Sequence, residues 1–286
     1  MTSPIPAAIL ATLEQAHPSW HPALLAGLTA VAEANPGYLP ELAGDSYLPT
    51  DGRLLAAFAQ PLNAVRYVLV GEGPYPRAAS ATGVCFMDGA VTSLWSDTGL
   101  SKSVNRATSL RNFMKMLLVA EGALHIDQTT GTAMAAIGLQ AQCPDSGRIQ
   151  TMPQLQSNLT AHGFLLLNAT PVFRPDVPPV KEARFWLPFL KKILDSLAER
   201  SVPAPSLVLW GKIAAQVNAL PGAERFPQQA AEHPYNLTFI GNLSMHRLFG
   251  PMHLLAAPGV TMAVASSDSR KPLQSIPDEI SQLCNT

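Results

Sequence analysis

Four short runs of apolar residues recur along the chain at intervals that suit an alternation of strands and helices. They cover residues 65–70, 164–167, 207–210 and, with a weaker pattern, 228–231. Each run is shorter than a typical helix and lacks the alternation of a half-exposed strand. The pattern therefore predicts strands that are buried on both faces.

The segments between these runs carry apolar residues three and four positions apart, as one face of a helix requires. One predicted helix contains Trp186, Leu190, Ile193 and Leu197. Another contains Leu110, Phe113, Met116 and Leu117. Ser109 is placed to cap this second helix. Alternating strands and helices predict an α/β fold, with three α/β/α layers around a central four-stranded, mostly parallel sheet.

Length and composition favour a single domain that spans residues 1–286. With 286 residues, 47% of them hydrophobic, the chain can bury one sizeable core. No apolar run approaches the roughly eighteen residues of a membrane span, and the first residues lack the order of a secretory signal. We therefore expect a cytoplasmic protein with no membrane partner.

The cysteines and the net charge limit which cofactors and partners the sequence predicts. Cys85, Cys143 and Cys284 are too few to hold a structural zinc ion or an iron–sulfur cluster through four thiolates, so no metal and no cofactor are expected. The formal net charge of -1 gives no overall basic signature, and nucleic-acid binding would need a local patch. Composition alone favours an ordinary metabolic enzyme.

The residues that follow the four runs are the candidates for chemistry, because ligands of parallel sheets bind beyond the carboxyl ends of the strands. These are residues 71–76, 168–170, 211–212 and 232–234. In the first segment, Gly71 and Gly73 with Pro74 predict a tight turn whose backbone N–H groups approach an anion. Pro76 stands where a dinucleotide-binding fingerprint needs its third glycine, which argues against a Rossmann cofactor site. An ordinary glycine–proline loop is the alternative.

Residues 68–76, with the sequence VLVGEGPYP, and residues 83–86, GVCF, resemble a known set of motifs. They are similar to the strand, the water-activating loop and the base-stacking phenylalanine of uracil-DNA glycosylases, at the same spacing. Further matches follow in the order of that family: SLRN at 109–112, LLLN at 165–168, LWG at 209–211, and HP at 233–234 followed by Leu237. The resemblance implies one glycosylase domain with a core of residues 19–265 and an insertion at residues 124–146.

The resemblance implies a pocket for a uracil base that has left the DNA helix. Phe86 would stack on the base, the Asn168 amide would read its N3–H and O4, and Tyr75 would exclude a methyl group at C5. His233, with backbone N–H groups near Glu72 and Gly73, would stabilise the negative charge that develops on O2. The implied reaction is metal-free hydrolysis of the N-glycosidic bond in base excision repair.

The same resemblance implies contacts with DNA outside the pocket. Leu237 would wedge into the base stack, while Ser109, Arg111 and Lys212 would contact phosphates. Further cationic candidates are Lys102, Arg106 and Lys115. The alternative for each of these charged residues is an ordinary solvated position on the surface. The implied partner is uracil-containing DNA, single- or double-stranded, and the protein is expected to act as a monomer.

One departure from the family pattern bears directly on catalysis. The common class has Gln, Asp and His where this chain has Glu72, Gly73 and Pro76. The missing aspartate orients the attacking water and helps to stabilise the cationic sugar in that class. The Gly-Glu-Gly-Pro loop resembles the Gly-Glu-Ala-Pro loop of the iron–sulfur class, so Glu72 is the candidate for positioning the water or for electrostatic support of the sugar. Together with Tyr235 and Asn236 in the later loop, the smaller groups predict a pocket that admits other damaged bases.

Two other functions fit the same residues. A catalytically silent protein that binds uracil-containing DNA would explain the lost aspartate. A nucleoside hydrolase would explain the near-neutral charge, but it would need neither a wedge at Leu237 nor contacts with phosphates. A gel assay for abasic product separates an enzyme from a binder. A preference for an oligonucleotide over free deoxyuridine excludes the nucleoside hydrolase.

Overall fold

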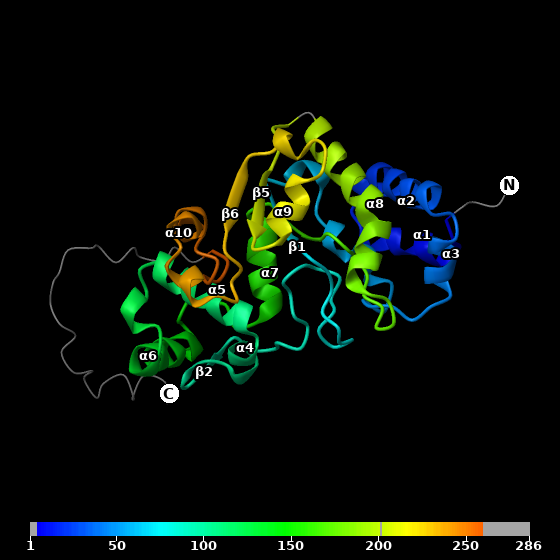
Figure 1. Ribbon diagram of the computed structural model, residues 1–286. Coiled ribbons are helices and arrows are strands. Elements are labelled where there is room, and N and C mark those ends of the chain that lie inside the picture. The colour runs from blue at the N-terminus through cyan, green and yellow to red at the C-terminus, as the bar shows by residue number, and fades with distance from the viewer. Residues whose placement is uncertain (1–4, 201, 260–286) are drawn as a thin grey trace. The chain divides into compact units, whose positions relative to one another are not determined.

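The structure, a computed structural model, describes residues 5–200 and 202–259 (Figure 1). The described chain forms two compact units. Unit 1 contains the residues up to Val91 together with Leu159–His233, and unit 2 contains Thr92–Asn158 together with the residues from Pro234 onward. A single domain with an insertion at residues 124–146 stays a prediction. Residues 260–265 of the predicted core and Cys284 lie outside the described residues.

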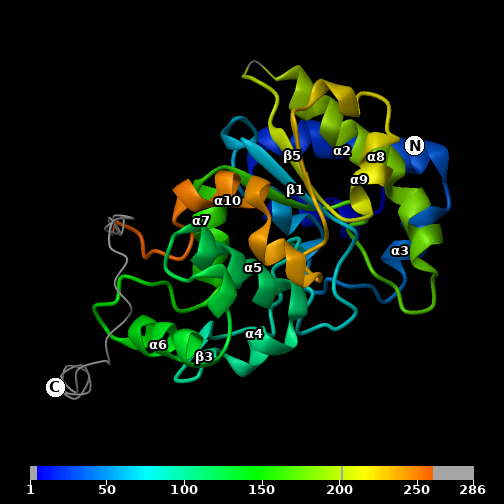
Figure 2. The same cartoon turned by 60° about the vertical axis from the view of Figure 1, so that its left-hand side comes forward.

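Unit 1 is built on a four-stranded sheet, part of which is seen in Figure 2. In the order β4-β1-β5-β6, the strands are β4 (Phe164–Asn168), β1 (Tyr67–Gly71), β5 (Ser206–Trp210) and β6 (Gln228–Ala231). Every neighbouring pair is parallel. The four predicted strands and the α/β fold class are confirmed, and the sheet is wholly rather than mostly parallel.

The strands β1, β4 and β5 bury side chains on both faces. In β1, Val68, Leu69 and Val70 are each at most 2% exposed, although successive side chains of a strand point to opposite faces. Every residue of β4 is buried as well. A strand covered on both sides has no polar face to present to water, which explains why the sequence shows continuous apolar runs instead of alternation.

Helices α2 (His21–Ala34) and α8 (Pro179–Glu199) lie side by side in both views (Figures 1 and 2). They share one hydrophobic core with the sheet residues Val68 and Val70. A Cβ atom at Gly27 of α2 would lie 2.6 Å from the ring of Phe189 of α8, so glycine permits this close approach. The helix predicted around Trp186 is confirmed as α8.

Short elements complete unit 1. Its other helices are α1 (Ala7–Ala11), α3 (Tyr38–Ala43) and α9 (Ile213–Asn218). Its short 3₁₀ segments are η1 (Thr12–Gln15), η2 (Pro18–Trp20), η3 (Arg53–Phe58), η4 (Leu62–Ala64) and η6 (Ala223–Arg225).

Helix α5 (Thr108–Ala120) is the main element of unit 2. The four apolar residues that predicted it are all buried, which confirms the helix. The prediction that Ser109 caps it is wrong: α5 begins at Thr108, and Ala107 occupies the N-cap position without a side-chain hydrogen bond. The chain already turns at Ala107, directly after α4 (Lys102–Arg106), so Ser109 falls inside the first turn. The serine that does cap a helix here is Ser101, which accepts the Val104 N–H of α4.

Part of the predicted insertion forms α6 (Gly131–Gln142), which packs on the hairpin of β2 (Trp95–Ser96) and β3 (Gly99–Leu100). A Cβ atom at Gly138 would collide with the carbonyl oxygen of Ser96, and Gly99 has a φ of +117°. Two glycines therefore let the helix and the hairpin touch. Unit 2 also contains η5 (Ile126–Gln128), η7 (Leu237–Gly241), α10 (Leu243–Phe249) and η8 (Gly250–Met252), and α7 (Met152–Ala161) includes the last residues before unit 1 resumes.

None of the helices among residues 5–200 and 202–259 combines the length and the apolar character needed to cross a membrane.

Candidate active site

The hydrogen bonding between β1 and β4 continues beyond the carboxyl ends of both strands. Gly71 pairs with Asn168 as the last residues of the two strands. The Ala169 N–H then donates to the Gly71 carbonyl at 2.8 Å, and the Thr170 N–H donates to the Glu72 carbonyl at 3.0 Å. Two predicted site residues, Glu72 and Asn168, are thus held on adjacent backbone segments at the carboxyl edge of the sheet.

The side-chain amide of Asn168 is well placed to bind a ligand. Asn168 is 6% exposed, and its amide makes no hydrogen bond to any residue that the structure describes. The amide is not among the fully buried side-chain groups that lack a partner, so it keeps access to solvent and to a ligand. A Cβ atom at Gly71 would lie 3.4 Å from Asn168 Oδ1 and would collide with the sulfur of Cys85. The glycine therefore makes room for Cys85, while a Cβ atom would only touch Asn168.

Phe86 adopts a backbone conformation that is rare for a residue with a side chain. Its φ is +67°, in the left-handed region, and such strain is held by surrounding structure. The preceding residue is fixed by the Cys85 N–H, which donates to the Leu166 carbonyl of β4 at 3.0 Å. The Phe86 ring meets Trp210, the last residue of β5, edge to face at 5.4 Å between centroids. The aromatic ring thus lies at the same sheet edge as Asn168.

Tyr75 is half-buried in the loop that follows β1. Burial raises the pKa of its hydroxyl, and the neighbouring Cys85 and Asp88 act in the same direction. The hydroxyl is therefore neutral at physiological pH. Gly73 lies against the segment after β4, since a Cβ atom there would be 3.3 Å from the Thr170 carbonyl oxygen. A larger residue at position 73 would have to displace this backbone.

His233 follows β6 and lies directly beside the end of β5. Gly211 has a φ of +71°, and a Cβ atom on it would be 2.8 Å from the Cβ of His233. The Gly211 N–H also donates to the Ala231 carbonyl at 2.9 Å, which continues the sheet pairing. Gly211, the glycine of the LWG motif, therefore allows His233 to pack against the end of β5. The sequence did not reveal this contact.

Glu72 and His233 interact electrostatically. Partial desolvation lowers the pKa of the exposed His233 imidazole below its usual value, and the Glu72 carboxylate opposes this shift. Since the net direction is downward, the imidazole is mostly neutral at pH 7. A neutral imidazole still carries one N–H that can donate a hydrogen bond to an oxygen atom. The carboxylate and the histidine therefore belong to one site.

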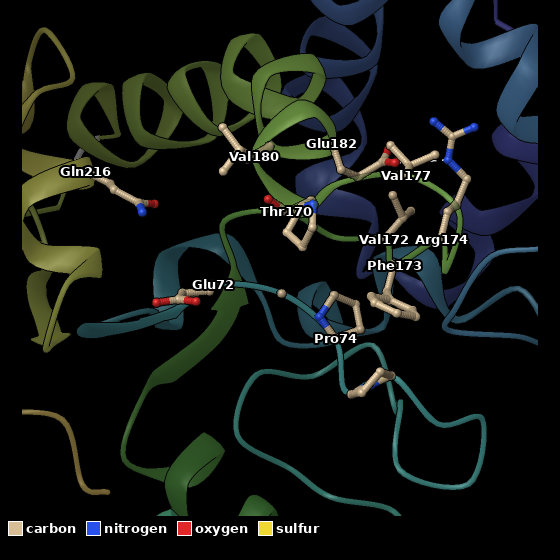
Figure 3. Close-up of a pocket in the computed structure, with 14 residues that line it drawn as sticks. Glu72, Pro74, Thr170, Val172, Phe173, Arg174, Val177, Val180, Glu182 and Gln216 are labelled. Atoms are coloured by element: carbon tan, nitrogen blue, oxygen red, sulfur yellow. Dashed lines mark hydrogen bonds and ion pairs between the residues drawn. The ribbon is translucent and has the colours of Figure 1, made fainter. Parts of the chain in front are cut away.

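A pocket of about 340 Å³ lies beside the loop after β1 (Figure 3). Figure 3 shows Glu72 at one end and Arg174 at the other, with Pro74 and Phe173 between them. Glu72 and Gly73 line this pocket, but the other predicted base-contacting residues do not. Tyr75, Phe86 and Asn168 therefore lie outside this pocket.

A buried ion pair fixes the segment that follows Asn168. Arg174 is 3% exposed, and its guanidinium donates to Glu182 of α8 at 2.9 Å and to Glu41 of α3 at 2.8 Å. Glu182 also accepts a hydrogen bond from Tyr38, whose hydroxyl accepts the Trp186 indole N–H at 2.6 Å. This network ties the chain between β4 and α8 to two helices and was not found from the sequence.

Lys212, predicted to contact a phosphate, is exposed in unit 1, directly after Gly211. The other three predicted DNA-contacting residues lie in unit 2. Ser109 and Arg111 are half-buried on α5, whereas Leu237 is 69% exposed at the start of η7. The sequence analysis gave no role to Asn112, the completely buried residue next to Arg111. Its sequence signal is a polar residue within the apolar face of α5, which the sequence analysis did not use.

The described residues contain no cluster of three or more His, Cys, Asp or Glu side chains that could hold a metal ion.

Comparison with known proteins identifies the family. No protein-family model matches the sequence. The crystal structure of the wild-type UNG from Nitratifractor salsuginis matches with a TM-score of 0.80 and 39% identity, covering 90% of this chain and 100% of that one. The chain belongs to the uracil-DNA glycosylase superfamily. Uracil-DNA glycosylase 1 of Streptomyces avermitilis is 29% identical over 193 residues, 67% of this chain and 68% of that protein.

A second curated member of the superfamily, the uracil-DNA glycosylase of Corynebacterium glutamicum, is 27% identical over 209 residues, 72% of this chain and 75% of that protein. Membership of the uracil-DNA glycosylase superfamily confirms the resemblance drawn from the loop and strand-end motifs. The roles of the individual residues stay predictions.

The electrostatic coupling of Glu72 and His233 predicts a measurable pKa change. NMR titration of the His233 ring should give a pKa below 6.5 in the wild type. In Glu72→Gln the pKa should fall further, because the carboxylate that favours the imidazolium is gone. Glu33→Gln removes an exposed carboxylate on α2 and should leave the titration unchanged. A rise of the His233 pKa in Glu72→Gln would contradict this arrangement.

Proposed function

We propose that the protein is a uracil-DNA glycosylase that binds an everted uracil at the carboxyl edge of the unit 1 sheet and hydrolyses its N-glycosidic bond. The observation that carries the proposal is Asn168 at the end of β4, which is 6% exposed and whose side-chain amide has no hydrogen-bond partner among the described residues. One amide offers both a donor and an acceptor, which is what the O4 and N3–H of uracil require. Cytosine presents the opposite pattern and is discriminated against.

The proposed reaction separates charge, and the site offers groups for both charges. The bond between deoxyribose C1′ and uracil N1 breaks, and its electron pair leaves with the base, so that negative charge develops on O2. The neutral His233 N–H stabilises this anion. Water adds its oxygen to C1′ of the cationic sugar, and the proton that it loses neutralises the uracil anion, which yields an abasic site and free uracil. The base must first leave the helix, at a cost of a few kcal/mol.

Glu72 is the proposed replacement for the aspartate of the common class. Its backbone is fixed by the bond from Thr170, while its carboxylate is exposed and acts on His233. A negative charge at this position supports the cationic sugar and orients the attacking water. Gly73 cannot do either, and its backbone lies too close to Thr170 for a larger residue without adjustment.

The proposed partner is DNA that contains uracil in either a single strand or a duplex, bound by a monomer. Arg111 and Lys115 on α5 form a local pair of cations in a chain that is otherwise near neutral, since the charge of Arg111 contributes to lowering the pKa of Lys115. Phosphate contacts of this kind position the duplex without reading its sequence. Leu237 is exposed as a wedge side chain must be.

The missing aspartate supports one alternative, a silent protein that binds uracil-containing DNA. Binding alone gives no reason for a neutral histidine held beside a carboxylate. Formation of an alkali-labile abasic site in a uracil oligonucleotide identifies the enzyme, whereas a retarded but intact oligonucleotide identifies the binder.

Substitution of the site residues tests the catalytic assignment. His233→Ala should lower kcat on a uracil oligonucleotide by about 100-fold, because a donor aimed at the leaving-group charge is lost. Asn168→Ala should lower kcat/KM strongly, and Glu72→Ala should have a smaller effect than His233→Ala. Excision is measured in a single turnover, with Glu33→Ala as the control. Unchanged rates in all three site variants would remove the assignment.

The close approach of Gly211 to His233 gives a second prediction. In Gly211→Ala the new methyl group must push His233 away, and a displacement of about 1 Å can cost on the order of 100-fold in rate. Gly222→Ala is the matched control, because Gly222 has a φ of +91° but faces only the side chain of Arg225. Both variants strain the backbone, so equal rates in the two would show that the contact with His233 is unimportant.

The small groups at positions 73 and 76 predict that the pocket also accepts other damaged bases. Duplexes containing uracil, hypoxanthine, xanthine or 5-hydroxymethyluracil should each release free base, measured by chromatography. Release of uracil alone would restrict the proposal to a uracil-specific enzyme.

A further inference from the structure

The loop of unit 2 that begins at Pro234 exposes two large apolar side chains close together. Tyr235 is 67% exposed and Leu237 is 69% exposed, whereas Phe239 and Ile240 of the adjoining η7 are buried and anchor it. A single exposed apolar residue is ordinary on a protein surface. Two of them within three positions of an anchored loop indicate a surface that meets another molecule.

The backbone of this loop is held from inside by one buried amide. Asn112 is 0% exposed, and its Nδ2 lies 2.7 Å from the Pro234 carbonyl oxygen, 3.3 Å from that of Tyr235 and 3.4 Å from that of Asn236. Successive carbonyls that face the same donor fix the path of the chain. The path of the loop backbone is therefore held by the Asn112 side chain.

The same amide connects the loop to a cationic side chain. The Arg111 Nε donates to Asn112 Oδ1 at 3.2 Å, and its Nη1 donates to the Asn105 carbonyl at 3.4 Å. Lys115, one turn further along α5, has a lowered pKa because of burial and the charge of Arg111. One hydrogen-bonded path thus leads from Arg111, through Asn112, to the loop that carries Tyr235 and Leu237.

We propose that Tyr235 is a second probe side chain, which stacks on a DNA base next to the space that Leu237 enters, and that Asn112 is the positioning residue that links this probe to Arg111. The inference rests on the proposed function in that the molecule bound is DNA. An aromatic ring suits this role because every base presents a stacking face, whatever the sequence. The neighbouring cations suit the phosphates that accompany those bases.

Excision from matched substrates tests the role of Tyr235. In the full-length protein, Tyr235→Ala should lower kcat/KM on a uracil duplex on the order of ten-fold, since a stacking contact is lost. The single strand of the same sequence needs no opening and should change much less. Tyr235→Phe keeps the ring and should behave as the wild type. Leu243→Ala removes another exposed side chain of unit 2, 66% exposed on α10, and should have no effect.

Equal loss on both substrates, or no loss on the duplex, would overturn the assignment of Tyr235. A binding measurement keeps the inference separate from the glycosylase proposal. The affinity for a duplex with a tetrahydrofuran abasic analogue, followed by fluorescence anisotropy, should weaken in Tyr235→Ala and not in Leu243→Ala. If the wild type releases no uracil and this difference remains, the glycosylase proposal fails while the contact with DNA stands.

Asn112→Ala and Asn112→Asp test the positioning role. Asp keeps the size and an acceptor for Arg111 but replaces the donor that the three carbonyls share. Both variants should lose duplex excision on the order of ten-fold and should retain most single-strand excision, which also demonstrates that they are folded. The fluorescence of a 2-aminopurine beside the uracil should report reduced base opening. A proportionate loss on both substrates would mean that Asn112 only maintains the fold.

Discussion

The candidate site depends on the parallel register of β1 and β4, in which Gly71 pairs with Asn168 and the pairing continues to Thr170. In a parallel sheet the carboxyl ends of all strands meet at one edge. Because the register is fixed by backbone hydrogen bonds, the residue after each strand is placed at that edge within narrow limits. A slip by one residue would send the side chains of the strand to the opposite faces.

Two glycines turn this backbone arrangement into a site. Gly71 leaves room for Cys85, and Gly211 leaves room for His233. At both places a side chain would occupy the space where a functional group now lies. Because glycine has no side chain, groups from neighbouring strand ends can come into contact at these two positions.

The two units carry different parts of the proposed function. Unit 1 holds the residues that read the base and stabilise charge, with Glu72 and His233 coupled electrostatically. Unit 2 holds the cationic residues of α5 and the loop with Leu237, joined through the buried Asn112. In a chain of nearly zero net charge, the proposed DNA contact therefore rests on the local pair of cations Arg111 and Lys115.

The sequence determined the strands, the two main helices and the order of the strand-end motifs, because each depends on local patterns of apolar burial. It also identified Asn168, Phe86, Tyr75 and His233 through their places in the motif order, although the assignment of their roles awaits experiment. Ser109 was wrongly predicted as a cap, since α5 begins at Thr108, two residues earlier than a cap at Ser109 requires. Only the tertiary structure revealed what Gly211, Asn112 and Arg174 contact. Their partners lie 22, 122 and 133 residues away in the chain, and no local pattern encodes a contact that arises when distant segments pack together.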